Sequence, residues 1–387
     1  MRFPEFSGEW EKFRNCTLFK VISEKNKNYE FSTVLSASQT EGMVLRDSLG
    51  IDIKFEEDSI KTYKIVRNGD YVAHLRSFQG GFAFSDKTGV CSPAYTILRP
   101  SETISYGFLK PYFMSRKFID SLRIVTYGIR DGKSISVEEW LRLYTCIPKK
   151  NEQQKISKLL RLIDNRIKTQ KKIIEDLKKL KEAINNSLHN NINEFQLFSF
   201  NELGNDYSGL TGKSSDDFGS GLPYISYLNV FRNDIVTDGP FDCVKVSKTE
   251  KQNIVSYGDL LFTLSSETPS EVGIGAVYLG KTNPLYLNSF CFGVHLSNQE
   301  NIYGPYLAYF VTSQYFRRTI LPFAQGSTRY NLMKSDFMKH KFCFPNIASQ
   351  KAIYNTLHTL SEKIQNEEVC LNKYTEQKQY LLTRLFI

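Results

Sequence analysis

Two segments of the chain repeat each other at a constant offset of 197 residues, and no other feature constrains the fold as strongly. The first segment spans residues 146–188 and the second spans residues 343–385. Eight positions are identical, including a proline and a glutamine near the start of each segment. The identical pairs are Cys146/Cys343, Pro148/Pro345, Gln153/Gln350, Ile156/Ile353, Leu160/Leu357, Ile167/Ile364, Lys181/Lys378 and Leu188/Leu385.

Apolar residues in both segments recur in alternating steps of three and four, which is the pattern of a coiled-coil seam. Polar pairs interrupt both seams at equivalent places, Gln170/Glu367 and Lys181/Lys378. Each copy predicts a helix of about 36 residues, ~54 Å long. We expect the two helices to pack on each other as an antiparallel coiled coil. The predicted seam residues are Leu160, Ile163, Ile167, Ile174, Leu177, Ile184 and Leu188 in the first copy, and Leu357, Leu360, Ile364, Leu371, Tyr374, Leu381 and Leu385 in the second.

The rest of the chain forms two pieces that each mix short strands with one helix. Short β-branched and aromatic runs, broken by glycine turns, predict the strands. The predicted helices span residues 107–123 and 304–321. The predicted strands include YVAHL (71–75), GFAF (81–84), AYTIL (94–98), LPYISYLNV (222–230), GAVYL (275–279) and FGVHL (292–296).

Small motifs recur in the two pieces as well. A glycine–aspartate turn enters a strand at Gly69-Asp70 and at Gly258-Asp259, and a glycine loop that ends in arginine follows each predicted helix. The whole half-chain is therefore repeated. The predicted fold is mixed α/β (α+β), with two tandem globular domains separated by two long helices. The predicted segments are 1–147, 148–190, 191–344 and 345–387.

The formal net charge of +9, from 50 Lys and Arg against 41 Asp and Glu, makes nucleic acid the first partner to consider. Most of the excess lies in one stretch, because residues 148–189 carry twelve Lys or Arg and five Asp or Glu, a net of +7. Residues 345–387 carry five and four, a net of +1. The globular pieces are thus nearly neutral, and a nucleic-acid site there would be a local patch. The lysine-rich stretch can equally be a solvated helix face.

Several classes of protein are excluded by what the sequence lacks. No apolar run approaches the ~18 residues that a membrane span needs, and residues 1–13 do not form a signal peptide. We expect a cytoplasmic protein without a membrane partner. The seven cysteines form no CxxC pair and the five histidines form no HxH or HExxH motif. We therefore expect reduced thiols, no metal site and no cofactor.

Two catalytic motifs are only partly matched. Asn283-Pro284-Leu285-Tyr286 resembles a methyltransferase loop, but Gly273-Ile274-Gly275 precedes it too closely to be the cofactor loop of a doubly wound sheet. Gly212-Lys213-Ser214 resembles the end of a phosphate-binding loop, but that motif needs glycine where the chain has Tyr207. No nuclease or hydrolase motif is present either. We expect no catalytic residues.

Several segments, in this order, resemble the specificity subunits of type I DNA restriction-modification systems. The resemblance covers the full length and depends on the order and duplication of the segments. They are RFPEFSGEWEKF near the start, SGLTGKSSDDFGSGLPYISYLNV, GDLLFT, the glycine–arginine loops, the EQQKI that leads the first long helix, and the terminal KQYLLTRLFI. The second helix copy departs from the pattern, because Ser349 stands where the first has Glu152.

The resemblance implies a non-catalytic subunit that reads DNA. In this family each globular domain is a target recognition domain for one half of a bipartite double-stranded DNA site. The paired helices form the spacer, which sets the gap and docks two methyltransferase subunits, and restriction subunits join the full complex. The missing glutamate in the second copy leaves open whether both copies bind the methyltransferase equally.

Candidate DNA-contacting residues are those with side chains that match base edges or phosphates. Arg76 and Gln79 lie between two strands, and Arg130 and Lys133 lie in the first glycine loop. The other candidates are Lys213, Ser214, Tyr227 and Asn229, in segments that match the family pattern, and Ser327, Thr328, Arg329 and Tyr330 in the second glycine loop. A local salt bridge is the alternative role for each arginine of the glycine loops. Lys213 and Ser214 fit phosphate contacts as well as base contacts.

A different class of function also fits the repeat. A coiled-coil adaptor could carry two ligand-binding modules without any DNA specificity. Such a protein would show no salt-dependent affinity for DNA, whereas counterion release makes the affinity of a DNA reader fall steeply with salt.

Overall fold

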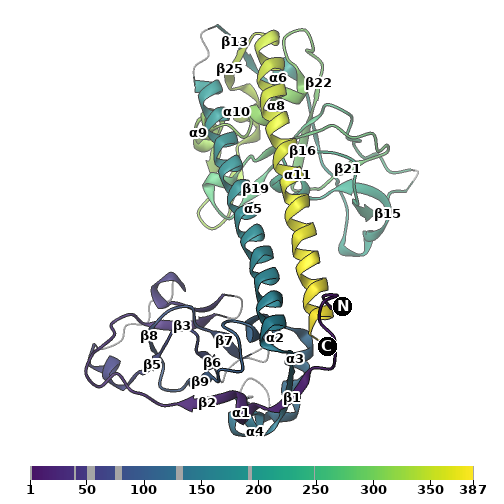
Figure 1. The fold of residues 1–387 in the computed structure, drawn as a ribbon. Helices are drawn as coiled ribbons and strands as arrows, with labels where there is room; N and C mark the ends of the chain where they lie inside the picture. Colours follow the sequence, from purple (N-terminus) through teal and green to yellow (C-terminus); the bar gives the residue numbers. More distant parts are fainter. Residues whose placement is uncertain are drawn as a thin grey trace. The chain divides into compact units, whose positions relative to one another are not determined.

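The computed structural model describes residues 2–38, 41–49, 57–74, 81–127, 134–190, 194–247 and 249–386. It divides into two compact units. Unit 1 comprises Met1–Lys171 and Val369–Ile387, and unit 2 comprises Lys172–Glu368. Two long helices, α5 (Lys150–Asn190) and α11 (Ile347–Leu385), contribute one half to each unit (Figure 1). The predicted mixed α/β class, with two globular parts and two long paired helices, is confirmed.

The globular part of unit 1 is built on a four-stranded antiparallel sheet with the order β2-β9-β6-β7. Two-stranded sheets surround it, formed by the pairs β1-β12, β3-β4, β5-β8 and β10-β11. Its elements are β1 (Glu11–Arg14), α1 (Asn15–Leu18), β2 (Phe19–Ile22), β3 (Leu35–Ser38), β4 (Gly42–Leu45), η1 (Arg46–Leu49), η2 (Glu57–Thr62), β5 (Lys64–Val66), β6 (Tyr71–Ala73), β7 (Phe82–Phe84), β8 (Gly89–Cys91), β9 (Thr96–Pro100), α2 (Leu109–Phe113), α3 (Arg116–Ser121), η3 (Leu122–Val125), β10 (Thr126–Tyr127), β11 (Ser134–Ile135), α4 (Val137–Arg142) and β12 (Tyr144–Ile147).

The globular part of unit 2 repeats this plan with additions. Its central sheet has the order β14-β22-β18-β20-β16, and three-stranded sheets β17-β15-β21 and β19-β24-β23 lie beside it. Its elements are β13 (Phe195–Ser199), α6 (Phe200–Leu203), β14 (Gly204–Ser208), η5 (Ser215–Asp217), β15 (Phe218–Ile225), α7 (Tyr227–Arg232), β16 (Ile235–Val236), β17 (Asp242–Val244), β18 (Leu260–Thr263), β19 (Ser265–Ser266), η6 (Pro269–Glu271), β20 (Gly275–Tyr278), β21 (Tyr286–Leu287), β22 (Cys291–Leu296), α8 (Gly304–Phe310), α9 (Gln314–Ile320), η7 (Leu321–Phe323), β23 (Ala324–Gln325), β24 (Tyr330–Leu332), α10 (Lys334–Lys339) and β25 (Lys341–Pro345).

The recurring glycine–aspartate turns have the same structure in both units. Gly69 and Gly258 have φ angles of +97° and +89°, a region in which a side chain is strained. The aspartate that follows each glycine is 2% exposed and accepts a hydrogen bond from the backbone N–H three residues before it. A buried carboxylate needs further partners. These are Arg99 for Asp70, and Tyr207 and His295 for Asp259.

Aromatic side chains fill both cores. In unit 1 the rings of Phe82 and Trp140 lie 4.7 Å apart, and in unit 2 the rings of Phe310 and Phe344 lie 4.6 Å apart. Tilted and edge-to-face ring pairs of this kind add to the free energy gained by burying apolar area. Both long helices take part in each core. The helix residues buried in these cores are Ile156, Leu160, Leu381, Leu382 and Leu385 in unit 1, and Ile353 and Leu357 of α11 in unit 2. The half-buried Ile184 and Leu188 of α5 pack against the core of unit 2.

In each unit, the half of α5 lies against the half of α11. In unit 1 Asp164 pairs with Lys378 at 2.6 Å, and Arg166 donates to the Tyr374 hydroxyl at 3.0 Å, an order that makes the helices antiparallel. In unit 2 Lys178 pairs with Glu368 at 2.7 Å. Every residue of the fourteen-member predicted seam is buried or half-buried. The two lysines that interrupt the seams both form ion pairs: Lys378 pairs with Asp164, and Lys181 pairs with Asp234.

The sequence prediction was wrong at three helix boundaries. Each of the predicted helices 107–123 and 304–321 is broken in two, because a serine caps the start of a second helix. The Ser115 hydroxyl accepts a hydrogen bond from Phe118 N at 3.3 Å, and the Ser313 hydroxyl accepts one from Phe316 N at 3.2 Å. The predicted strand 222–230 ends at Ile225, where Ser226 starts α7 in the same way. A serine cap at each break outweighs the apolar pattern that continues through it.

Candidate nucleic-acid interface

Four of the predicted DNA-contacting residues lie outside the described residues, and the other eight lie in unit 2. Arg76, Gln79, Arg130 and Lys133 are the four. The last two belong to the connection between β10 and β11, whose strands pair Thr126 with Ile135. In unit 2, β23 and β24 occupy the corresponding place, and their connection is described in full.

The β23–β24 connection is a tight hairpin that depends on Gly326. This residue has a φ angle of +143°, and a Cβ atom there would lie 2.0 Å from the carbonyl oxygen of Arg329. Only glycine permits so close an approach of backbone to backbone. The hairpin holds Ser327, Thr328 and Arg329 at the surface, where all three are exposed.

Arg329 lies over an exposed aromatic ring that the sequence analysis did not select. Its guanidinium carbon is 5.3 Å from the centre of the Phe290 ring, and Phe290 is 52% exposed. The Phe290 backbone is fixed, because its carbonyl oxygen accepts from Leu264 N at 2.8 Å. Among the residues that the structure describes, no carboxylate forms an ion pair with Arg329. A guanidinium held on a ring keeps its planar donors available for a ligand.

Strand β19 joins this hairpin to the start of α7. Tyr330 pairs with Ser266 in the sheet, and the Tyr227 hydroxyl donates to the carbonyl oxygen of Ser265 at 2.9 Å. Burial raises the pKa of Tyr227, so its hydroxyl stays protonated and acts as a donor. The structure thus gathers four residues from separate parts of the sequence, which we name the β19 cluster. They are Tyr227, Phe290, Arg329 and Tyr330.

Asn229 has a structural contact that occupies its carbonyl oxygen. Its Oδ1 atom accepts from the backbone N–H of Ser226 at 2.9 Å and from the Ser226 hydroxyl at 2.7 Å. The first of these bonds, together with the bond from Asn229 N to the Ser226 hydroxyl oxygen at 3.4 Å, forms the capping box of α7. Asn229 therefore positions Tyr227, the first residue of that helix.

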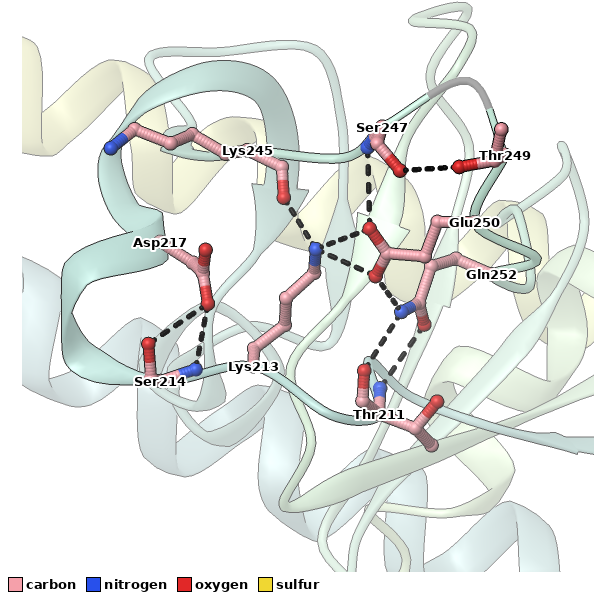
Figure 2. A network of polar contacts seen from close by, with 9 residues as sticks. All are labelled: Thr211, Lys213, Ser214, Asp217, Lys245, Ser247, Thr249, Glu250 and Gln252. Atoms are coloured by element: carbon pink, nitrogen blue, oxygen red, sulfur yellow. Dashed lines mark hydrogen bonds and ion pairs between the residues drawn. The ribbon is translucent and has the colours of Figure 1, made fainter.

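Lys213 and Ser214 lie in a separate polar network, shown in Figure 2. The Lys213 ammonium lies 2.6 Å from Glu250 Oε1 and donates to the Lys245 carbonyl oxygen at 2.5 Å, and its side chain is only 7% exposed. The hydrogen bond from Lys213 is the main cause that lowers the pKa of Glu250. A cation that is buried and paired in this way is not presented to a phosphate group.

The same network fixes the backbone on both sides of Lys213. Thr211 and Gln252 exchange two hydrogen bonds, at 3.1 and 2.8 Å. Ser214 donates from its N–H and its hydroxyl to Asp217, at 2.8 and 3.0 Å, and the backbone bond is the main cause that lowers the pKa of that carboxyl. The partial match to a phosphate-binding loop is therefore a rigid turn with carboxylates on its surface.

The described residues hold no group of three or more His, Cys, Asp or Glu side chains placed to bind a metal ion. Burial raises the pKa of Cys91 and of Cys291 to about 12, so neither thiol is a nucleophile near neutral pH. Within the same residues no helix combines the length and apolar character that a membrane span requires.

Comparison with known proteins gives one family and a set of similar folds. Residues 184–374 match the family model of the type I restriction modification DNA specificity domain. A search of curated proteins gave no match. Among solved structures, a chain from work on complex assembly and conformational transition of the type I restriction-modification system is 15% identical, with a TM-score of 0.60, covering 99% of this chain and 98% of that chain.

Two further solved structures have the same fold over the full length. The type I specificity subunit from M. genitalium is 16% identical with a TM-score of 0.57, and covers 100% of this chain and 99% of that chain. The HsdS subunit from Thermoanaerobacter tengcongensis is 13% identical with a TM-score of 0.50, covering 100% of this chain and 98% of that chain.

Proposed function

We propose that this chain is the DNA-recognition subunit of a type I restriction-modification system, because residues 184–374 match the model of the type I DNA specificity domain and the chain has the fold of type I specificity subunits. The resemblance seen in the sequence is confirmed. Each globular part would read one half of a bipartite site on double-stranded DNA. The adaptor alternative is not favoured, because it gives no reason for a DNA specificity domain.

We infer that sequence reading in unit 2 centres on the β19 cluster. The observation that carries this inference is Arg329, exposed on a glycine hairpin and held over Phe290 at 5.3 Å. Bidentate donation from arginine to guanine is the commonest specific contact in the major groove. Ser327 and Thr328, exposed on the same hairpin, would contact the DNA backbone or a neighbouring base.

In unit 1 the proposed readers are the four residues outside the described ranges. Arg130 and Lys133 belong to the connection between β10 and β11, the counterpart of the β23–β24 hairpin, and Arg76 and Gln79 belong to the connection between β6 and β7. Because the two connections differ in sequence, the two units would read different half-sites.

Lys213 and Asn229 would act through other residues. Lys213 holds the loop between β14 and β15 in one conformation, and Asn229 holds the first turn of α7 under Tyr227. Ser214 is exposed, but Asp216 and Asp217 beside it would repel a phosphate group. We therefore propose that this loop positions the domain and contributes to shape.

The long helices would serve as spacer and docking surface. Helix α5, with 41 residues, is ~61 Å long. Apolar residues remain exposed on both helices, which supports their contact with partner subunits. These residues are Leu162, Ile173, Leu180, Val369 and Tyr380. We propose that two methyltransferase subunits dock here, that restriction subunits join them, and that catalysis belongs to those partners.

Binding measured on the chain reconstituted with its methyltransferase tests this proposal. The affinity for duplex DNA that contains the methylated site should fall linearly with the logarithm of salt concentration and exceed the affinity for scrambled DNA about 1000-fold or more. An affinity for DNA that depends neither on sequence nor on salt would support the coiled-coil adaptor hypothesis instead.

A further inference from the structure

Unit 1 contains a half-open pocket of about 290 Å³ that the proposed DNA-reading role does not use. Six of its thirteen lining residues are aromatic, among them Trp10, Tyr112, Phe118, Trp140 and Phe386. All of these residues belong to unit 1. A pocket of this size is close to the lower end of ligand sites and accommodates one bulky side chain or a small ring.

At three positions of the pocket lining, unit 1 carries smaller or polar residues where unit 2 carries aromatic ones. Asn15 is the first residue of α1, and Phe200 is the first residue of the equivalent helix α6. Lys117 lies two residues after Ser115, which caps α3, and Tyr315 lies two residues after Ser313, which caps α9. Thr145 precedes Cys146 in β12 as Phe342 precedes Cys343 in β25. In unit 2 the rings of Phe200 and Phe342 lie 5.1 Å apart, and the Tyr315 hydroxyl accepts from Cys343 N at 3.1 Å.

Two polar side chains of the lining, Asn15 and Thr145, form hydrogen bonds within the wall of the pocket. Thr145 donates to Asn15 Oδ1 at 2.7 Å, and Asn15 donates to the Trp140 carbonyl oxygen at 2.9 Å. The indole nitrogen of Trp10 is buried and has no hydrogen-bond partner in the described part of the chain. Because this nitrogen exposes almost no surface, it lies within the wall and does not face the open space of the pocket.

The rim of the pocket is both apolar and basic. Ile124 and Tyr144 line it with 70% and 49% of their surface exposed. The Lys12 ammonium and the Arg14 guanidinium lie over the Tyr144 ring, at 4.7 and 5.6 Å, and the exposed Lys117 lines the pocket itself. Exposed apolar residues around a pocket are typical of a protein-docking site, and the cations favour an acidic partner.

We propose that this pocket receives a single bulky apolar side chain from an acidic segment of a partner protein. The side chain fills the space between the aromatic walls, and acidic residues of the segment face Lys117, Lys12 and Arg14. Because aromatic side chains occupy the corresponding positions of unit 2, each chain binds one such segment. The proposal does not depend on how either unit reads DNA.

The two tryptophans of the chain both line this pocket, so tryptophan emission reports on it directly. The full chain is titrated with an acetylated pentapeptide in which one phenylalanine has two aspartates on each side. A second peptide has alanine in place of phenylalanine. We expect a saturable change in emission with the first peptide and an affinity about tenfold weaker with the second, because truncating an anchor costs more than 1 kcal/mol.

Two variants at one exposed position test the site. Lys117→Tyr copies the residue of unit 2 and should abolish the saturable change, and Lys117→Glu should weaken binding about fivefold or more through charge reversal. Lys20→Glu makes the same change of charge at an exposed position away from the pocket and should leave binding unchanged. Thermal unfolding of each variant confirms that it is folded.

Four outcomes would overturn the proposal. The first is no saturable change up to about 10 mM peptide, because a weaker dissociation constant corresponds to less than ~3 kcal/mol of binding free energy. The second is equal binding of the phenylalanine and alanine peptides, and the third is unchanged binding by Lys117→Tyr. The fourth is tighter binding of a single-stranded oligothymidylate than of the peptide, which would make the pocket a nucleic-acid site.

Discussion

Gln153 and Gln350, 197 positions apart, make the same three hydrogen bonds in their own units, with distances between 2.8 and 3.0 Å. Each side-chain amide donates to two carbonyl oxygens and accepts from one backbone N–H. The partners are Pro148 O, Thr103 O and Ser105 N for Gln153, and Pro345 O, Asn301 O and Tyr303 N for Gln350. The repeat therefore extends to a buried polar clamp that ties the start of each long helix to its globular part.

Gln153→Ala should lower the free energy of unfolding by about 2–3 kcal/mol, because it leaves buried backbone groups without partners. Gln153 is 1% exposed, so water cannot replace the lost bonds without rearrangement. The matched control is Gln154→Ala, one residue along and exposed, with an expected change below about 0.5 kcal/mol. Chemical denaturation measures both, and equal stability of the two variants would show that the clamp contributes nothing.

Arg329→Lys should weaken binding to the cognate site by about 1–3 kcal/mol and relax the preference at one base pair of one half-site. Lysine keeps the charge but lacks the rigid planar fork of N–H donors that matches the edge of guanine. Arg318→Lys, at an exposed position of α9, is the matched control and should bind as the original protein does. Affinities for a set of single-base variants of the site provide the test. An equal loss of affinity for every sequence would instead mean that Arg329 contacts a phosphate group.

Phe290→Ala should weaken the same half-site by about 0.5–1 kcal/mol, because the ring that orients Arg329 is lost. If the ring acts through the arginine, the effects of Phe290→Ala and Arg329→Ala will not add. A double-mutant cycle of DNA affinity measures this coupling. Additive losses would mean that Phe290 contacts DNA by itself or only stabilises the loop.

His189 makes the stability of unit 2 dependent on pH. Burial lowers the pKa of His189 to about 4, and its ring packs on Tyr306 at 5.5 Å between centres. In the unfolded chain the group titrates near 6.5, so the unfolded state binds more protons and stability falls as the pH falls from about 6.5 to about 4. The loss by pH 4 is of the order of 3 kcal/mol.

Two reciprocal variants test this pH dependence. Phe386 occupies in unit 1 the position that His189 occupies in unit 2, since the offset of 197 relates them. His189→Phe should reduce the fall in unfolding free energy between pH 7 and pH 4.5, and Phe386→His should increase it. An unchanged pH profile in both variants would contradict the assignment.

Much of the architecture was predictable, because the signals that specify it are local. The seam residues recur at helical spacing, and matched prolines mark the start of each long helix, so the two helices and the duplicated modules follow from the sequence. The helix breaks at Ser115 and Ser313 were missed, although a serine before each break is a local signal. An apolar pattern that runs through a capping residue hides it.

The candidate interface was predictable only in part, because it is assembled by long-range contacts. The glycine hairpin that carries Arg329 is visible in the sequence, but the ring beneath it, Phe290, lies 39 positions earlier and comes close through strand pairing. Lys213 likewise matched a DNA-contact pattern, yet Glu250, 37 positions later, binds its ammonium. Neither partner can be identified from a pattern of neighbouring residues.

Above all, we infer that this chain determines which DNA sequence its methyltransferase modifies. Single-molecule sequencing should map methylated adenines in cells that carry the gene with its neighbouring methyltransferase gene, and in cells that lack only this gene. We expect a split motif of methylated adenines that disappears with the gene and that loses selectivity at one half-site in the Arg329→Ala variant. Methylation that is unchanged by the deletion, with the methyltransferase present and active, would contradict it.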